Sequence, residues 1–254
     1  MHLGISYNLF DGEELLTPAI KAIRNKVDYI SVVYQNISNK NESIDLNFEW
    51  LDLVDVAIKY EPDLNKEPRW NETNKRNIGL NASKTNRCTH HASLDVDEFY
   101  TADSFELVKE LKEDFSLVKY VNYFKSPCWK VVDERGNQIV TFVHKISAVY
   151  DQNAHFGFPV DRTRRLKGVN SFRVYNREEI EMQHMTFVRN DIGLKIRNSS
   201  SDQHAEMLDV YHKYDLGQPL VLPPMYRSVT TIEVENQFGI RSEHGIKCNR
   251  DRSR

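Results

Sequence analysis

Three carboxylates, Asp95, Asp97 and Glu98, stand close together in the sequence. Like charges within a few ångströms repel one another, and a divalent cation held by oxygen ligands is the usual compensation. The cluster directly follows an apolar run with strand character at residues 90–94. Because ligands of open α/β sheets bind at the carboxyl ends of the strands, the cluster predicts a metal site at that edge.

The segments around this cluster alternate between strand and helix patterns. Strands are predicted at residues 2–7, 29–34, 54–58 and 90–94, and apolar residues at helical spacing predict helices over 15–23 and 72–82. Pro18 falls near the expected start of the first helix, where proline is tolerated. Right-handed crossover connections would make the first two strands parallel, with their carboxyl ends at one edge of the sheet.

The second half of the chain is richer in consecutive strands. A helix is predicted at 103–115, strands at 117–124, 138–144, 146–150, 172–175 and 182–188, and helices near 191–197 and 202–214. The fold class is therefore expected to be α/β, with a mixed central sheet flanked by helices.

Length, composition and charge narrow the protein class. The chain has 254 residues, of which 40% are hydrophobic and 28% are charged, as in globular proteins. No repeat or long linker divides it, so a single domain over 1–254 is expected. A net charge of -3 argues against a protein whose main partner is a nucleic acid.

Cysteine spacing and hydropathy bear on the compartment. Cys88, Cys128 and Cys248 are an odd number without a short paired spacing, so we expect neither a disulfide framework nor a structural zinc site. No apolar run approaches the roughly 20 residues of a membrane span. A cytoplasmic protein is predicted. The basic tail at 241–254 is expected to be either a plain end or a peripheral contact with anionic lipid.

Several segments together resemble the GT-A class of nucleotide-sugar glycosyltransferases. The Asp-x-Asp-Glu-Phe form is similar to the family 2-related and family 92-like branch, and the resemblance covers roughly residues 1 to 200. The segments that carry it are Ser6-Tyr7-Asn8, Asp11-Gly12-Glu13-Glu14, Val33-Tyr34-Gln35-Asn36, residues 71–80, residues 94–99 and residues 182–189.

The resemblance implies a Rossmann-like GT-A fold and a division of labour along the chain. Residues 1–125 would bind the nucleotide-sugar, and residues 126–240 would face the acceptor. It also implies a metal-dependent, inverting transfer of a sugar to a glycan or glycolipid acceptor. Asp95, Asp97 and His184 would bind Mn²⁺ or Mg²⁺, and the imidazole favours Mn²⁺. The implied nucleotide contacts are Tyr7, Asn8, Gln35, Arg76 and Asp95.

An inverting transfer needs a general base for the acceptor hydroxyl. Asp161 and Asp191 are the two candidates, and the sequence does not choose between them. Two alternative functions stay open. A sugar nucleotidyltransferase shares the sheet and the metal chemistry, but it usually has a glycine-rich basic loop after its first strand, which residues 8–12 are not. A non-catalytic nucleotide- or carbohydrate-binding module could keep the same fold without turnover.

Overall fold

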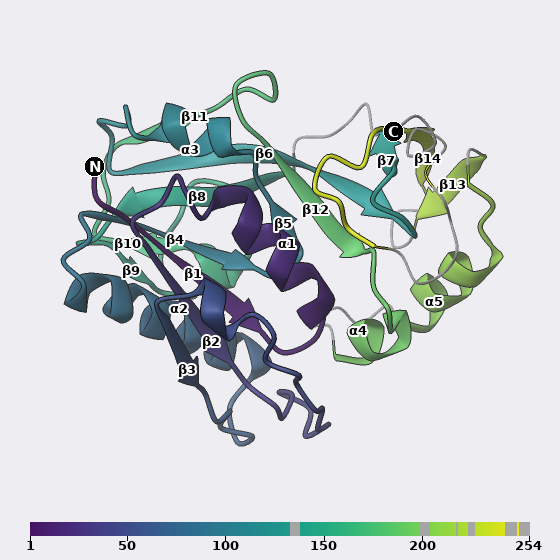
Figure 1. The fold of residues 1–254 in the computed structure, drawn as a ribbon, viewed down its shortest axis with the longest axis horizontal. Helices are drawn as coiled ribbons and strands as arrows, with labels where there is room; N and C mark the ends of the chain where they lie inside the picture. Colours follow the sequence, from purple (N-terminus) through teal and green to yellow (C-terminus); the bar gives the residue numbers. More distant parts are fainter. Residues whose placement is uncertain (133–137, 199–203, 217, 223–226, 242–247, 249–254) are drawn as a thin grey trace.

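A computed structural model describes residues 1–132, 138–198, 204–216, 218–222, 227–241 and 248 (Figure 1). The predicted basic tail lies outside these residues, apart from Arg241 and Cys248. The elements in chain order are β1 (Leu3–Leu9), α1 (Glu13–Ile23), β2 (Tyr29–Tyr34), η1 (Leu51–Leu53), β3 (Val56–Lys59), α2 (Pro68–Thr85), β4 (His90–Asp95), β5 (Glu98–Phe99), α3 (Ala102–Val108), β6 (Phe115–Phe124), β7 (Trp129–Val132), β8 (Ile139–Lys145), β9 (Val149–Tyr150), η2 (Arg162–Arg164), β10 (Leu166–Lys167), β11 (Phe172–Val174), β12 (Glu181–Phe187), α4 (Ile192–Asn198), α5 (His204–Lys213), β13 (Pro219–Leu222) and β14 (Arg227–Glu233).

Four parallel strands form one side of the central sheet, in the order β4-β1-β2-β3. Their connections pass through α1 and α2, as expected for parallel neighbours. The register sets Asn8 beside Asp95 across β1 and β4. The predicted parallel arrangement is confirmed, and it brings the ends of β1, β2 and β4 to one edge.

The other side of the sheet is mixed. Strand β8 runs antiparallel to both β4 and β6, whereas β11 and β12 run parallel to β6. Strand β12 also pairs antiparallel with the short β5, which sets His184 opposite Glu98. The α/β class with a mixed central sheet flanked by helices is therefore confirmed, and β12 returns to the acidic cluster.

Residues of β1 alternate between two different environments. Leu3, Ile5 and Leu9 belong to the main apolar cluster, together with buried side chains of α1 and α3. Ser6 and Asn8 lie on the opposite side, where Ser6 meets Gly79 of α2. This side of β1 carries small and polar residues, so α2 can approach the sheet closely.

Two glycines mark that close approach. A Cβ added at Gly79 would lie 2.3 Å from the Cβ of Ser6, and one added at Gly4 would lie 2.7 Å from the Cβ of Ser83. Both distances are too short for real contacts, so glycine is required at each site for packing. Ser83 of α2 also binds the sheet, because its Oγ lies 2.9 Å from Nδ1 of the buried His91 of β4.

A second apolar cluster lies beyond the end of β6. Phe124 packs there against Tyr211 and Tyr214, and Ile192 and Ile196 of α4 belong to the same cluster. Figure 1 shows α4, α5, β7, β13 and β14 gathered on one side of the molecule. Strands β13 and β14 lie in a segment for which no strand is predicted, and β14 extends the sheet through β7.

Three other boundaries differ from the sequence predictions. Helix α3 ends at Val108 instead of continuing to 115, and β6 begins at Phe115. Helix α2 begins earlier than predicted, with Pro68 at its first position, where proline is favoured. Pro18 lies inside α1 and not at its start.

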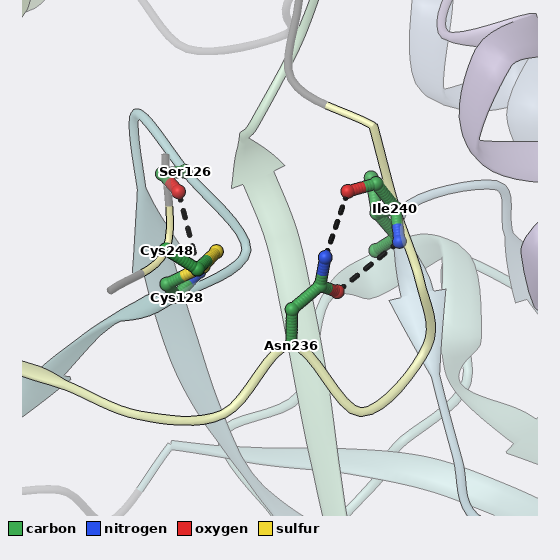
Figure 2. Close-up of a disulfide and its surroundings, with 5 residues drawn as sticks. All are labelled: Ser126, Cys128, Asn236, Ile240 and Cys248. Atoms are coloured by element: carbon green, nitrogen blue, oxygen red, sulfur yellow. Dashed lines mark hydrogen bonds between the residues drawn. A yellow bond between two sulfur atoms is a disulfide. The ribbon is translucent and has the colours of Figure 1, made fainter. Parts of the chain in front are cut away.

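A disulfide joins Cys128 to Cys248 (Figure 2), so the prediction that no disulfide forms is wrong. The two cysteines are 120 residues apart, and their Cα atoms lie 5.8 Å from each other. Sequence spacing gives no signal for a pair that the fold brings together over such a separation. Cys88 is free and buried. The cysteines therefore give no support to the predicted cytoplasmic location.

The side chain of Asn236 closes a turn at residues 236–240. Asn236 accepts a hydrogen bond from the backbone N of Ile240 at 3.1 Å and donates one to its carbonyl at 2.9 Å (Figure 2).

Within the described part of the chain, no helix combines the length and apolar character that a bilayer span requires.

Candidate active site

A polar cavity of about 200 Å³ lies at the carboxyl ends of β1, β2 and β4. Six of the sequence-predicted site residues line it together: Asn8, Gln35, Arg76, Asp95, Asp97 and Asp161. They come from separate segments of the chain, which the fold brings to this edge of the sheet. The predicted grouping of these residues is therefore present in the fold, whereas their chemical roles stay predictions.

Two arginines bind Asp95. The Nη2 atom of Arg76 lies 3.0 Å from Oδ1 and 3.1 Å from Oδ2, and Nη2 of Arg164 lies 2.8 Å from Oδ2. Both arginines are buried, with 3% and 4% of their surface exposed. Burial alone would raise the pKa of Asp95, but Arg76 and Arg164 outweigh it and hold the pKa well below its usual value. Both oxygens of Asp95 are therefore engaged by protein cations.

Asp97 is more deeply buried and binds a different pair of cations. Its Oδ2 accepts hydrogen bonds from Nη2 of Arg189 at 2.7 Å and from Nζ of Lys195 at 3.1 Å. Burial would raise the pKa of Asp97, but Lys195 and Arg189 hold it well below the usual range. Only Oδ2 is used in these bonds, so Oδ1 is directed elsewhere.

His184 faces that second oxygen. Its Nε2 lies 3.7 Å from Oδ1 of Asp97, and its Nδ1 lies 2.9 Å from Oδ1 of Asn122. The amide nitrogen of Asn122 donates to Gln138, so its oxygen is the atom that accepts from Nδ1 of His184. Burial lowers the pKa of His184 to about 4, although Asp97 opposes the shift. The neutral ring thus turns the lone pair of Nε2 towards the Asp97 carboxylate.

This arrangement fits a divalent cation held by two protein ligands. A carboxylate oxygen and an imidazole lone pair facing one another repel unless a cation or proton lies between them, and a second partner that orients the histidine is typical of metal sites. Both oxygens of Asp95 accept from arginines, so its predicted role as a metal ligand stays a prediction. The described residues contain no cluster of three or more histidine, cysteine, aspartate or glutamate side chains arranged for a metal. Phosphate and water oxygens would have to complete the coordination, as they do at many magnesium sites.

Glu98 contacts residues of the site but does not line the cavity. Its Oε1 lies 2.5 Å from Nη2 of Arg164, and its Oε2 accepts a hydrogen bond from the backbone N of Asp95 at 3.1 Å. Burial raises the pKa of Glu98 to about 7, although Arg164 opposes the shift. Glu98 therefore fixes Arg164 and the backbone at Asp95, and it does not line the cavity.

The amide side chains in the cavity wall have free acceptor atoms. Gln35 is 1% exposed and donates from Nε2 to the carbonyl of Ile37 at 2.7 Å, whereas its Oε1 has no hydrogen-bond partner among the described residues. Asn8 is 6% exposed, and its Oδ1 is likewise without a partner in the described part of the chain. Buried acceptors without partners cost free energy, so these oxygens are suited to a ligand with N–H or O–H groups. Tyr7 lies in the apolar cluster instead and is not brought to the cavity.

The two predicted general bases are both committed to local structure. Oδ1 of Asp161 accepts from the backbone N of Thr163 at 2.7 Å and from its hydroxyl at 2.6 Å, at the rim of the cavity. Oδ1 of Asp191 accepts from the backbone N of Leu194 at 2.8 Å, at the start of α4. Asp191 is exposed and does not line the cavity. Their predicted catalytic role stays a prediction.

Sequence reasoning missed the four cations as a set. Only Arg76 is a predicted site residue, whereas Arg164, Arg189 and Lys195 come from η2, from the segment after β12 and from α4. Arg164 belongs to a basic run at 161–167, but the sequence does not reveal which of its arginines is buried. Buried carboxylates usually have cationic partners, so partners for Asp95 and Asp97 could be expected. The sequence does not show which arginines and lysines these partners are.

A second, larger cavity of about 930 Å³ adjoins the first. It lies between the start of α1, the loop at 44–50 and the segment 237–241. Phe10 and Asp11 line both cavities and so form the wall between them. The molecule thus offers two adjacent spaces at one edge of its sheet.

No protein-family model matches the chain, and no curated protein matches it. Solved structures with similar folds include S. aureus TarS 1-349, at 11% identity and a TM-score of 0.46, covering 81% of this chain and 68% of that one. TarS 1-349 in complex with UDP-GlcNAc matches at 12% identity, a TM-score of 0.42 and coverages of 81% and 69%. The inositol-1-phosphate CTP transferase from T. maritima matches at 12% identity, a TM-score of 0.35 and coverages of 73% and 89%. The chain spans 43% of a longer TarS structure. With TM-scores this low, any function has to be argued from the site itself.

Proposed function

We propose that the protein is a GT-A glycosyltransferase that moves a sugar, with inversion, from a nucleotide-sugar donor to a glycan or glycolipid acceptor. The observation that carries the proposal is the pair formed by Asp97 and His184, whose facing oxygen and nitrogen lie 3.7 Å apart. Asp97 lines the polar cavity, and His184 lies behind it, outside the lining. Mn²⁺ or Mg²⁺ held by this pair would neutralise charge on the leaving diphosphate.

The cavity wall supports an anionic, hydrogen-bonding ligand. Arg189, Lys195, Lys75 and Arg76 line it and can bind phosphate oxygens. The free acceptor oxygens of Gln35 and Asn8 can bind donor groups of the base or ribose. A nucleoside diphosphate carries both kinds of group, which is why this ligand class fits better than a simple sugar or a simple anion.

The buried cations of the site would also stabilise the leaving diphosphate. As the bond between the sugar and the diphosphate breaks, negative charge grows on the leaving oxygen, and cations already in place stabilise it without reorganisation. Arg189 and Lys195 are held at Asp97 for this purpose. Asp95 keeps Arg76 oriented in the cavity wall, and Arg164, which does not line the cavity, holds Asp95 in place.

A thermal-shift screen tests the donor site. UDP, GDP, CDP and TDP are added with and without Mn²⁺ to the native protein, to Asp97→Asn and to His184→Leu. We expect one nucleotide to raise the melting temperature in a metal-dependent way, because ligand binding to the native state stabilises it. The two variants should lose the metal dependence, and Asp52→Asn, an exposed aspartate outside both cavities, should keep it. A native protein that responds to none of the four nucleotides would overturn the proposal.

Turnover separates the rival functions. Release of nucleoside diphosphate from a nucleotide-sugar indicates a transferase, and UDP-GlcNAc, the ligand in one of the similar structures, is the first donor to test. Release of pyrophosphate from a nucleoside triphosphate and a sugar phosphate would instead indicate a nucleotidyltransferase. Binding without either reaction would indicate a module that binds but does not catalyse.

A further inference from the structure

We propose that Asp11 is the general base that takes the proton from the acceptor hydroxyl, and that the larger cavity receives the acceptor. The inference rests on the proposed glycosyltransferase function and adds to it a residue and an acceptor site. It assigns the base to neither Asp161 nor Asp191.

Asp11 is shared by the two cavities. It comes just after β1, with Phe10 between, and it lines both the small polar cavity and the large one. Phe10 is the only other residue that the two cavities share among the described residues, and its side chain has no acid-base chemistry. A transfer reaction needs a group that reaches the donor on one side and the acceptor on the other, and Asp11 is placed for this.

The carboxylate of Asp11 makes few contacts with the protein. Oδ2 of Asp11 is buried and has no hydrogen-bond partner among the described residues, and its ion-pair contact is Nε of Arg189 at 3.7 Å. The side chain as a whole is 15% exposed, so part of it remains open to the cavities. A base must present an accessible oxygen to the incoming proton. Oδ1 of Asp11 meets this requirement, because it is not among the buried oxygens of the described residues, whereas Oδ2 faces Arg189.

The neighbouring carboxylates are already used. Glu13 accepts hydrogen bonds from the backbone at Asn47 and Phe48 and from the indole of Trp50, and so holds the loop at 44–50. Oε1 of Glu14 accepts from the backbone N of Asn190 at 2.9 Å. These bonds give both glutamates structural roles.

Arg189 fixes the geometry between the base and the leaving group. One face of its guanidinium binds Asp97 at 2.7 Å, and its Nε faces Asp11 at 3.7 Å. Gly12, with φ of 77°, lets the chain pass this side chain, because a Cβ there would lie 2.5 Å from Nη1 of Arg189. Asp11 and Asp97 are thus held at two different nitrogen atoms of one buried arginine.

The reaction step balances with these groups. The acceptor hydroxyl, entering from the larger cavity, attacks the anomeric carbon while its proton passes to the Asp11 carboxylate. The new bond joins the acceptor oxygen to the anomeric carbon, and the bond from that carbon to the diphosphate oxygen breaks. The electron pair leaves with the nucleoside diphosphate.

The test measures nucleoside diphosphate release, with water as the acceptor, from UDP-GlcNAc, UDP-glucose and GDP-mannose. It compares the native protein with Asp11→Asn, Asp11→Ala and the matched control Asp52→Asn. We expect both Asp11 variants to lose at least about 100-fold in rate, as for removal of a general base. Their thermal shift with the matching nucleoside diphosphate should remain that of the native protein, and Asp52→Asn should behave as the native protein in both assays.

Azide distinguishes a base from a residue that only positions Arg189. Azide attacks carbon without losing a proton, so it needs no base, and we expect it to restore turnover of Asp11→Ala and to yield a glycosyl azide detectable by mass spectrometry. Turnover of Asp11→Asn close to the native rate would overturn the inference, and so would an Asp11→Ala protein that azide does not rescue. A native protein that neither binds a nucleotide nor releases one would instead contradict the proposed function.

Discussion

The side-chain oxygen of Asn122 lies 2.9 Å from Nδ1 of His184 and thereby determines which ring nitrogen faces Asp97. Asn122 belongs to β6 and His184 to the neighbouring β12, so the contact depends on the register of two parallel strands. The ring orientation is therefore a property of the sheet and not of the loop that carries the acidic cluster.

Replacing Asn122 by leucine should weaken Mn²⁺ binding without removing a proposed ligand. Loss of a partner that orients a metal-bound histidine typically costs about 10- to 100-fold in affinity. A titration of Mn²⁺ followed by thermal shift measures the change, with Asn153→Leu on an exposed loop as the control. Equal Mn²⁺ affinity in Asn122→Leu and the native protein would contradict the orienting role.

The close approach of α2 to β1 predicts a stability effect at Gly79. Gly79→Ala should lower the free energy of unfolding by about 1 to 3 kcal/mol, because the new methyl group overlaps Ser6. Urea unfolding measures the loss. Gly157→Ala is the matched control, because a Cβ there meets no atom within 4 Å. The packing account fails should both variants unfold at the same urea concentration.

The buried histidines predict a pH dependence of stability. Burial lowers the pKa of His144 to about 4 from 6.5, while its ring lies 3.0 Å from the Tyr150 hydroxyl. Between pH 6.5 and about 4, His144 is protonated in the unfolded chain and neutral in the folded one. The free energy of unfolding therefore falls as the pH drops through this range. The slope due to one such histidine is about 1.4 kcal/mol per pH unit.

Melting temperatures of the native protein and His144→Gln between pH 7 and pH 4 measure this contribution. The variant should be less stable at neutral pH and should lose less stability on acidification. His91, which also has its pKa well below the usual value because of burial, remains in both proteins, so some slope persists. Parallel curves for the two proteins would show that His144 does not supply the effect.

The disulfide predicts a difference between oxidised and reduced protein. Cys128→Ser or reduction should lower the free energy of unfolding by about 2 to 4 kcal/mol, because the bond restricts the unfolded chain. Intact mass with and without reductant reports the bond, and thermal unfolding reports its effect. Cys88→Ser provides a control, since Cys88 is not paired. Identical masses and melting temperatures under both conditions would exclude the bond.

Local patterns predicted the central part of the fold well. Strands β2 and β4 lie where apolar runs indicated them, and the parallel pairing with β1 follows from the crossover rule. The pairing of Asp97 with His184 could be anticipated only from the resemblance, because 87 residues (184 − 97) separate them in the sequence. Strands β13 and β14 lacked a strong alternating pattern and went unpredicted.

Long-range contacts account for what the sequence did not reveal. Arg164, Arg189 and Lys195 reach the carboxylates from three separate elements, and nothing local distinguishes them from exposed basic residues. Asp11 belongs to a segment that carries the resemblance, yet its place between two cavities depends on loops far along the chain. Charge pairing inside a fold is decided by tertiary geometry, which periodicity does not encode.

Gly79 comes three residues after Arg76, so the two lie about one turn apart on the same side of α2. Gly79 contacts Ser6 of β1, and Arg76 lines the cavity at the end of the sheet. Anything that pushes the helix away from β1 also withdraws the Arg76 guanidinium from Asp95. Packing of α2 against β1 and the position of Arg76 are therefore linked: a substitution that loosens the packing at Gly79 also displaces Arg76 from the cavity wall. Under the proposed function, a change of ligand preference with less effect on packing is expected at Gln35, which lies just after β2 and away from α2.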